Sequence, residues 1–173
     1  AGNRISLTDA ENNATTWSYD GVSRVVEATN DLDDSRLFEY DDSGLVSIRT
    51  DREGRVIEFD YDDAGRLTEE RWKEGATTVN TLQFTYDPDS RTSTADDNQS
   101  SYAYSYDLNG AVSEVDNNGT TGVPRVILSA AYSRQVEQTS LSASVAGTND
   151  FLNSHQYDKL GRMSRIDQDS NGG

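Results

Sequence analysis

The stretch TDREGRVIEFDYDDAGRLT, residues 50–68, contains one turn signal twice, with a short alternating segment between the two copies. The copies are Asp51-Arg52-Glu53-Gly54 and Asp62-Asp63-Ala64-Gly65, and an arginine follows each of them. Aspartate is favoured at the first position of a type I turn, and glycine at the fourth, where it adopts a positive φ at little cost. A type I turn that is closed by a left-handed residue commonly reverses a β-hairpin.

The segment between the two turns has a period of two. Ile57, Phe59 and Tyr61 alternate with Glu58 and Asp60. Successive side chains of a strand point to opposite faces, so the three apolar residues share one face and the two acids share the other. The stretch therefore predicts the order turn, strand, turn, strand.

The second turn, with its preceding tyrosine, recurs along the chain. Clear copies begin at residues 19, 40, 61, 86, 106 and 157, Tyr132-Ser133 is a degenerate copy, and successive tyrosines of this series are 20 to 26 residues apart. A period of roughly 20 to 50 residues indicates a repeat architecture, in which each unit buries its apolar face only against its neighbours. The predicted structural motif residues are Tyr19, Asp20, Arg24, Tyr40, Asp41, Gly44, Asp51, Gly54, Arg55, Tyr61, Asp62, Gly65, Arg66, Tyr86, Asp87, Arg91, Tyr106, Asp107, Gly110, Tyr157, Asp158, Gly161 and Arg162.

These residues resemble the YD-repeat, or RHS-repeat, family over nearly the whole chain. The motif Tyr-Asp-x-x-Gly-Arg-Leu is intact at residues 61–67 and has methionine in place of leucine at residues 157–163. The upstream half of the family's unit, Thr-Asp-x-x-Gly-Asn or Thr-Asp-x-x-Gly-Arg, is found at residues 50–55 and more weakly at residues 8–13, where a reversal is predicted at residues 9–13. The departures are serine for glycine at Ser23 and Ser90, the loss of arginine at Leu45 and Ala111, and the missing aspartate after Tyr132.

No stretch with a helical period and helix caps occurs, so we expect an all-β fold, built as an antiparallel meander of about a dozen short strands. A sheet that wide must twist and curl. The resemblance implies that it is the wall of a β-shell, like those of RHS core proteins, insecticidal toxin complexes and teneurin-type proteins. We expect residues 1–173 to form one segment of six to seven hairpin repeats within a much larger protein. Locally, we predict a polar connector at residues 30–35, a further turn at residues 116–119, and a strand at residues 136–145 followed by a turn at residues 146–149.

The composition excludes several classes of protein. The chain of 173 residues has no cysteine, so it has neither a disulfide framework nor a thiolate zinc site. Its formal net charge of −16 argues against binding to nucleic acid or to anionic membrane surfaces. No apolar run is long enough to insert in a membrane. An acidic surface that keeps a sheet soluble and discourages edge pairing explains the charge, and calcium binding is the alternative.

Several candidate sites have simpler structural explanations. The tyrosines might form a sugar-binding row, but packing on the next hairpin, with the hydroxyl group at the rim, is the favoured interpretation. The arginines after the turns are expected to pair with neighbouring acids rather than to bind anions. His155 is the only histidine, so it cannot anchor a usual zinc site. Asp60, Asp62 and Gly65 partly mimic a calcium loop, but Ala64 occupies a ligand position, so a turn is favoured.

We therefore predict no catalytic residue, no metal site and no cofactor. By resemblance, the chain is a non-enzymatic segment of a β-shell in a large secreted or cell-surface protein, and the shell encloses a C-terminal toxin or effector. Its partners would be the neighbouring repeats and the enclosed domain of its own polypeptide. The alternative is an extracellular module that binds carbohydrate, in which Trp17-Tyr19 or the row Tyr102, Tyr104 and Tyr106 would stack on sugar rings, or that binds a cell-surface protein in adhesion.

Overall fold

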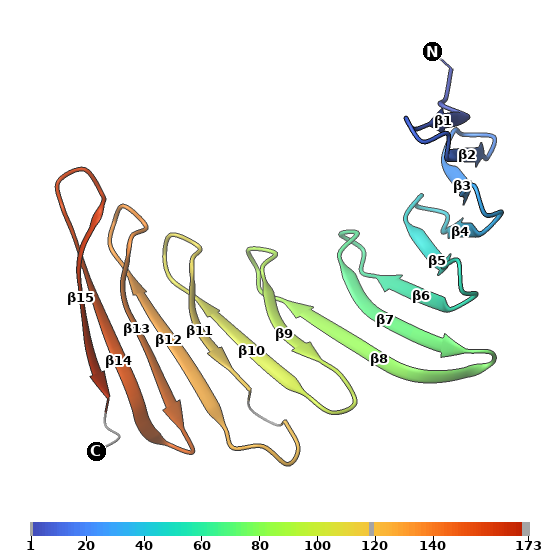
Figure 1. Ribbon diagram of the computed structural model, residues 1–173. Helices are drawn as coiled ribbons and strands as arrows, with labels where there is room; N and C mark the ends of the chain where they lie inside the picture. Colours follow the sequence, from blue (N-terminus) through green and yellow to red (C-terminus); the bar gives the residue numbers. More distant parts are fainter. Residues whose placement is uncertain (1, 118–119, 171–173) are drawn as a thin grey trace. The chain divides into compact units, whose positions relative to one another are not determined.

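The computed structural model describes residues 2–117 and 120–170, which form fifteen β-strands and no helix (Figure 1). Each strand is hydrogen-bonded to the next one along the chain, and the printed pairings are all antiparallel. The predicted all-β antiparallel meander is thus confirmed. The strands are β1 (Ser6–Thr8), β2 (Ala14–Tyr19), β3 (Val25–Thr29), β4 (Ser35–Tyr40), β5 (Val46–Thr50), β6 (Val56–Tyr61), β7 (Leu67–Glu74), β8 (Thr77–Tyr86), β9 (Thr92–Asp96), β10 (Ser101–Tyr106), β11 (Val112–Asp116), β12 (Val126–Tyr132), β13 (Gln138–Val145), β14 (Thr148–Tyr157) and β15 (Met163–Ser170). The described residues contain no helix that is long and apolar enough to cross a membrane.

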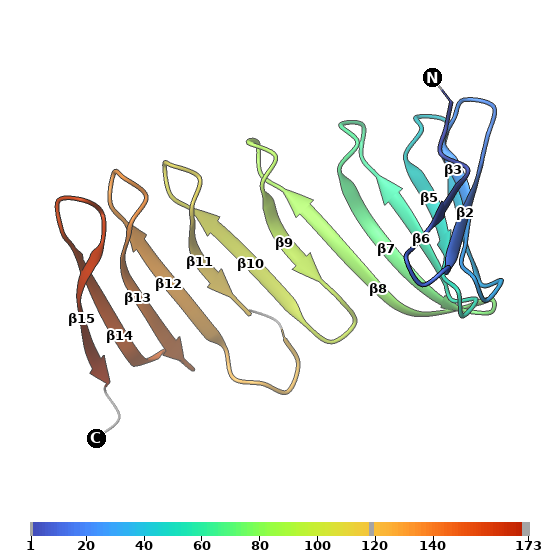
Figure 2. The ribbon, with the colours of Figure 1, turned by 45° about the horizontal axis from the view of Figure 1, so that its top comes forward.

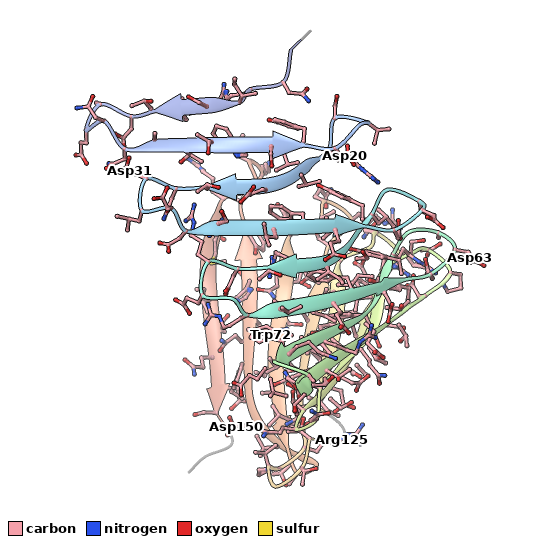
Figure 3. All side chains as sticks on the ribbon, turned by 90° about the vertical axis from the view of Figure 1, so that its right-hand side faces the viewer. Asp20, Asp31, Asp63, Trp72, Arg125 and Asp150 are labelled. Atoms are coloured by element: carbon pink, nitrogen blue, oxygen red, sulfur yellow. The ribbon has the colours of Figure 1, made fainter. Side chains whose placement is uncertain are left out.

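The chain divides into two compact units, Ala1–Leu82 and Gln83–Gly173, and the boundary between them falls inside β8. In the second unit, the turns of the hairpins β10–β11, β12–β13 and β14–β15 all lie at one end of the strands (Figures 1 and 2). In the first unit, Asp20 and Asp63 mark the turns at one end of the strands, and Asp31 marks a turn at the other end (Figure 3). Alternate turns of a meander lie at the same end of its strands. The tyrosine-aspartate turns of each unit are therefore brought together at one end of the strands.

Neither unit has a closed core. Among the described residues only Ala143, with 5% of its surface exposed, and Asp116, with 7%, are buried. The Asp116 carboxylate is paired with Arg125, whose Nη2 lies 2.6 Å from Oδ2. Each unit is one layer of strands, so its apolar side chains are covered only by their neighbours on the same face.

The two faces of each unit differ in polarity. The face that carries the tyrosines before the turns is called here the tyrosine face. In the first unit its cross-strand rows include Phe38, Arg49, Ile57 and Trp72, which are successive partners in the register of β4 to β7. In the second unit the corresponding row is Tyr104, Val115, Leu128, Ala143 and Phe151. The opposite face is more polar, and its residues include Ser18, Glu27, Glu58, Arg71, Ser105, Glu114 and Ser129.

Some local predictions were wrong. Residues 30–34 form a tight turn rather than a connector, and Ser35 already lies in β4. Val136 belongs to the turn before β13 rather than to the strand, and β14 begins at Thr148, so only two residues join β13 to β14. Asp116 ends β11 instead of opening a turn, while Asn118 and Gly119 of that predicted turn lie outside the described residues.

Candidate functional site

The turn at Asp62 shows how one carboxylate organises a repeat. The Gly65 amide donates to the Asp62 carbonyl oxygen at 2.8 Å, and the Asp62 amide donates to the Arg66 carbonyl oxygen at 2.9 Å. Asp62 Oδ1 accepts hydrogen bonds from the amides of Ala64, at 2.9 Å, and Arg66, at 3.0 Å. Asp62 Oδ2 accepts one from Arg66 Nε at 2.7 Å. Gly65 has a φ of +76°, the left-handed conformation that the sequence predicted for this position.

The same geometry recurs at the other predicted turns. Arginine pairs with the aspartate four residues earlier in the turns that begin at Asp20, Asp51, Asp62, Asp87 and Asp158, with the closest N–O distances at 2.6 to 2.7 Å. The prediction that these arginines pair with neighbouring acids is confirmed. Ser23 and Ser90 take the place of glycine with φ values of +71° and +63°, so the substitutions leave the path of the backbone intact. Asp41 and Asp107 keep the backbone bonds of the turn, although Leu45 and Ala111 stand where the arginine would be.

The hydrogen bonds to the turn carboxylates lower their pKa values. The side-chain hydrogen bond from Arg66 lowers the pKa of Asp62, and the one from Arg55 lowers the pKa of Asp51. For Asp20 the largest contribution to the lowered pKa is the backbone N–H of Arg24. The ionised form of each carboxylate is therefore the form that fits the folded turn.

At five of the turns, the preceding tyrosine links its strand to the segment that comes before it in the sheet. The Tyr61 hydroxyl donates to the Val46 carbonyl oxygen at 2.9 Å, and the Tyr40 hydroxyl donates to that of Val25 at 2.6 Å. Val25 and Val46 are the first strand residues after the preceding turns. The hydroxyl groups of Tyr19, Tyr106 and Tyr157 make equivalent bonds to the carbonyl oxygens of Arg4, Thr92 and Gln138.

These tyrosine hydroxyl groups were expected at the rim of the sheet, and the sequence did not predict that they bond to backbone carbonyl groups. For Tyr40, Tyr61 and Tyr106, the acceptor is the carbonyl oxygen of the first residue of the strand after the previous turn. Burial raises the pKa of Tyr61, and the negative charges of Asp41 and Glu70 add to the effect. Tyr86 lies at the end of β8, immediately before the Asp87 turn.

Some arginines of the turns also touch the next tyrosine. The guanidinium carbon of Arg24 lies 4.3 Å from the centre of the Tyr40 ring, and that of Arg91 lies 4.5 Å from the centre of the Tyr106 ring. Both distances are within the range of a cation–π contact. Such an arginine holds its own aspartate and covers the tyrosine of the following hairpin.

One turn of the same kind, at Asn30, was missed in the sequence, whereas the reversal predicted at residues 9–13 is confirmed. Asn30 Oδ1 accepts hydrogen bonds from the amides of Leu32, at 3.0 Å, and Asp34, at 2.8 Å. Asp9 closes its turn in the same way with the amides of Glu11 and Asn13. Asp33 and Asn12 hold the positive φ in these two turns. Asparagine and aspartate tolerate that conformation better than most residues, so an Asn or Asp three positions after another Asn or Asp was the signal.

The residues considered as metal or catalytic candidates are engaged elsewhere. His155 Nδ1 lies 2.9 Å from the Gln138 carbonyl oxygen. Asp60 pairs with Arg71, whereas Asp62 belongs to its own turn, so the two carboxylates of the calcium-like sequence face different arginines. Across the described ranges, no three acidic or histidine side chains are grouped in a way that would hold a metal ion.

Comparison with known proteins gives a family for part of the chain. Residues 40–77, which include the turns at Asp41, Asp51 and Asp62, match the family model described as RHS Repeat. The resemblance found in the sequence is therefore confirmed for this segment. No curated protein matches the chain in sequence.

Solved structures of Tc toxin components share the fold. One is the Tc holotoxin pore of Photorhabdus luminescens with the mutation TccC3-D651A, which has a TM-score of 0.74 and 14% identity over 95% of this chain. The complexes TcdB2-TccC3-Cdc42 and TcdB2-TccC3-TEV have TM-scores of 0.76 and 0.75, at 13% and 14% identity, again over 95% of this chain. This chain covers only 9% to 10% of the length of those chains.

Proposed function

We propose that this chain is a structural segment of a β-shell in a larger secreted or cell-surface protein, and that the shell encloses a C-terminal toxin or effector domain of the same polypeptide. The whole of residues 1–173 would then act as one run of repeats. The chain's partners would be the neighbouring repeats and the enclosed domain, and its role would be steric rather than catalytic.

The observation that carries this proposal is the way in which most hairpins are fixed to the one before them. The hydroxyl groups of five of the turn tyrosines bond to a backbone carbonyl group of the preceding hairpin, as in Tyr40 and Tyr61, and an aspartate closes most of the turns. Such a sheet grows by adding hairpins, without a second layer or a closed core, as a wall requires. The likeness to Tc toxin components over 95% of the chain supports the same assignment.

Limited proteolysis of the full-length protein tests the enclosure. We expect a segment on the C-terminal side of the repeats to survive protease until the shell is denatured. The double variant Tyr61→Phe, Asp62→Ala removes a bond between hairpins and a turn carboxylate, so it should expose the segment at a lower urea concentration. Tyr132→Phe is the matched control, because no hydrogen bond of the Tyr132 hydroxyl group occurs among the described residues. Immediate digestion of the segment in the native protein would refute enclosure.

A glycan-binding or adhesive module is the second candidate. Tyr102, Tyr104 and Tyr106 alternate along β10, and Tyr102 is 40% exposed, so a row of rings is offered on the tyrosine face. Aromatic rings of this kind stack on the apolar faces of sugars. Binding to a glycan array that is lost in Tyr104→Ala, with an unchanged circular dichroism spectrum, would favour this candidate over enclosure.

A further inference from the structure

The tyrosine face carries an aromatic series that is interrupted once. Two residues before each turn tyrosine the chain has Trp17, Phe38, Phe59, Phe84, Tyr104 and His155, but Ala130 occupies this position before Tyr132. Residues two apart on a strand share a face, so each of these side chains lies beside its tyrosine. Six of the seven positions thus hold a planar ring, and the seventh holds a methyl group.

A pocket lies where that ring is missing. It has a volume of about 190 Å³, and its lining includes Val115, Leu128, Ala130, Tyr132 and Leu141. Leu141 is the cross-strand partner of Ala130, and Val115 is that of Leu128, so the lining side chains surround the alanine on β11, β12 and β13. An apolar cavity of roughly 150 Å³ is known to hold benzene in another protein, so the pocket is large enough for one ring.

A second gap lies beside the first one. Arg24 and Arg91 lie over Tyr40 and Tyr106, which are the tyrosines that follow their turns. The corresponding residue before Tyr132 is Ala111, which is too short to reach its ring. No cation lies over Tyr132 among the described residues, so its ring remains available as one wall of the pocket.

We propose that this pocket binds one neutral aromatic ring, carried as a tyrosine or phenylalanine side chain by an extended polypeptide. Every ring at the equivalent positions of the other repeats is itself a side chain on a polypeptide, and the pocket provides the surroundings of such a ring without the ring itself. The formal net charge of −16 disfavours an anionic ligand. The proposal does not depend on enclosure, because it concerns only the second unit.

Binding can be measured by NMR, with the methyl groups of Ala130, Leu128 and Leu141 as reporters. The peptide acetyl-Gly-Tyr-Gly-amide is titrated into the chain, and acetyl-Gly-Ala-Gly-amide is the control. A single ring contributes few contacts, so we expect a Kd on the order of 1 mM for the tyrosine peptide, and no saturable shift with the alanine peptide. Phenol should bind and cyclohexanol, a ring of the same size that is not planar, should bind at least about threefold more weakly.

Two variants of β12 distinguish binding in the pocket from binding elsewhere on the sheet. Ala130→Phe fills the pocket with the chain's own ring, so it should weaken peptide binding by at least about tenfold. Ala131→Phe adds the same side chain on the opposite face and should leave the Kd within about a factor of two. If Ala130→Phe does not fold, Ala130→Val fills part of the pocket and should weaken binding by about threefold.

Three results would overturn the proposal. One is the absence of saturable shifts at the three reporter methyl groups with the tyrosine peptide. Another is unchanged peptide binding in whichever Ala130 variant folds. The third is binding of phenol without binding of the tyrosine peptide, which would make the pocket a site for small molecules.

Discussion

The turns at Asp62 and Ser133 follow the same backbone path with very different side chains. The Ser133 amide donates to the Glu137 carbonyl oxygen at 2.8 Å, and the Val136 amide donates to the Ser133 carbonyl oxygen at 3.0 Å, as in the Asp62 turn. Ser133 Oγ accepts from the amides of Gln135 and Glu137 at 3.2 and 3.3 Å, longer than the bonds to Asp62 Oδ1. The hairpin at Ser133 thus forms without the motif residues. The backbone and the alternating pattern of the strands already define the course of the turn, and the motif residues add stability to it.

The largest difference between the two turns should appear in acid. Hydrogen bonds lower the pKa of Asp20, Asp51, Asp62, Asp87 and Asp158, so their stabilisation is complete above the unfolded-state pKa of about 4 and is lost as the pH falls through the lower folded-state values. Ser133 has no such charge. We expect the urea midpoint, followed by circular dichroism, to fall as the pH drops from 5 to about 2.

The variant Asp62→Asn tests whether the loss of stability in acid comes from protonation of the turn carboxylates. The amide group keeps an oxygen for the backbone N–H groups but cannot ionise, so the midpoint of the variant should change less between these two pH values. A wild-type midpoint that is independent of pH, or an identical pH profile in the variant, would contradict the role given to the carboxylates.

Removal of the side chain should cost more at Asp62 than at Ser133. Asp62→Ala leaves two turn amides and the guanidinium group of Arg66 without their common acceptor. Ser133→Ala removes two long bonds that a neutral oxygen accepts, together with the hydrogen bond that this hydroxyl group donates to Glu137 Oε2 at 3.1 Å. We expect a clearly lower urea midpoint for Asp62→Ala and a smaller decrease for Ser133→Ala. Equal decreases would mean that the charge adds nothing to the turn.

The fourth position of the two turns differs in backbone strain. Gly65 and Val136 have φ values of +76° and +63°, and a β-branched residue is a genuine outlier in this conformation. Gly65→Val should therefore destabilise the chain by about 1–3 kcal/mol, whereas Val136→Gly should stabilise it by about 1 kcal/mol. Val136→Ala keeps a Cβ atom and is the control, so its gain should be smaller. A loss of stability in Val136→Gly would show that Val136 makes contacts worth more than the strain.

The hydroxyl groups of Tyr61 and Tyr132 should differ less in their contribution to the free energy of unfolding. The Tyr61 hydroxyl group donates to Val46, so Tyr61→Phe should cost about 0.5–1.5 kcal/mol. No hydrogen bond of the Tyr132 hydroxyl group occurs in the described part of the chain, and Tyr132→Phe should change the free energy of unfolding by less than about 0.5 kcal/mol. Both values follow from urea unfolding at neutral pH. Equal losses of stability in the two variants would show that the hydroxyl bond does not stabilise the link between hairpins.

The sequence predicted the fold and the turns because both depend on local chemistry. Aspartate and glycine at fixed positions and a period of two in residues 57–61 are visible without a structure. The target of the Tyr61 hydroxyl group was not visible, because Val46 is fifteen positions away and is brought close only by the pairing of β5 with β6. The pairing of Asp116 with Arg125 was missed for the same reason, since it joins the end of β11 to the residue that precedes β12. The turn at Asn30 was not predicted because Asp33, rather than a glycine, has the positive φ in this turn.

The smallest effect should come from restoring an arginine that the Asp41 turn lacks. An arginine at position 45 can reach Asp41 Oδ2 as Arg24 reaches Asp20, and it can cover Tyr61 as Arg24 covers Tyr40. Exposed pairs of this kind contribute about 0–1 kcal/mol, and the loss of the apolar side chain of Leu45, which lines one hollow with Tyr61 and Gly65, offsets part of that gain. Leu45→Arg should therefore stabilise the chain slightly at low salt. The gain should disappear at about 1 M NaCl, where exposed charges are screened. Leu45→Gln lacks the charge, so a gain of the same size in that variant, or a gain that persists in salt, would assign the effect to packing rather than to the ion pair.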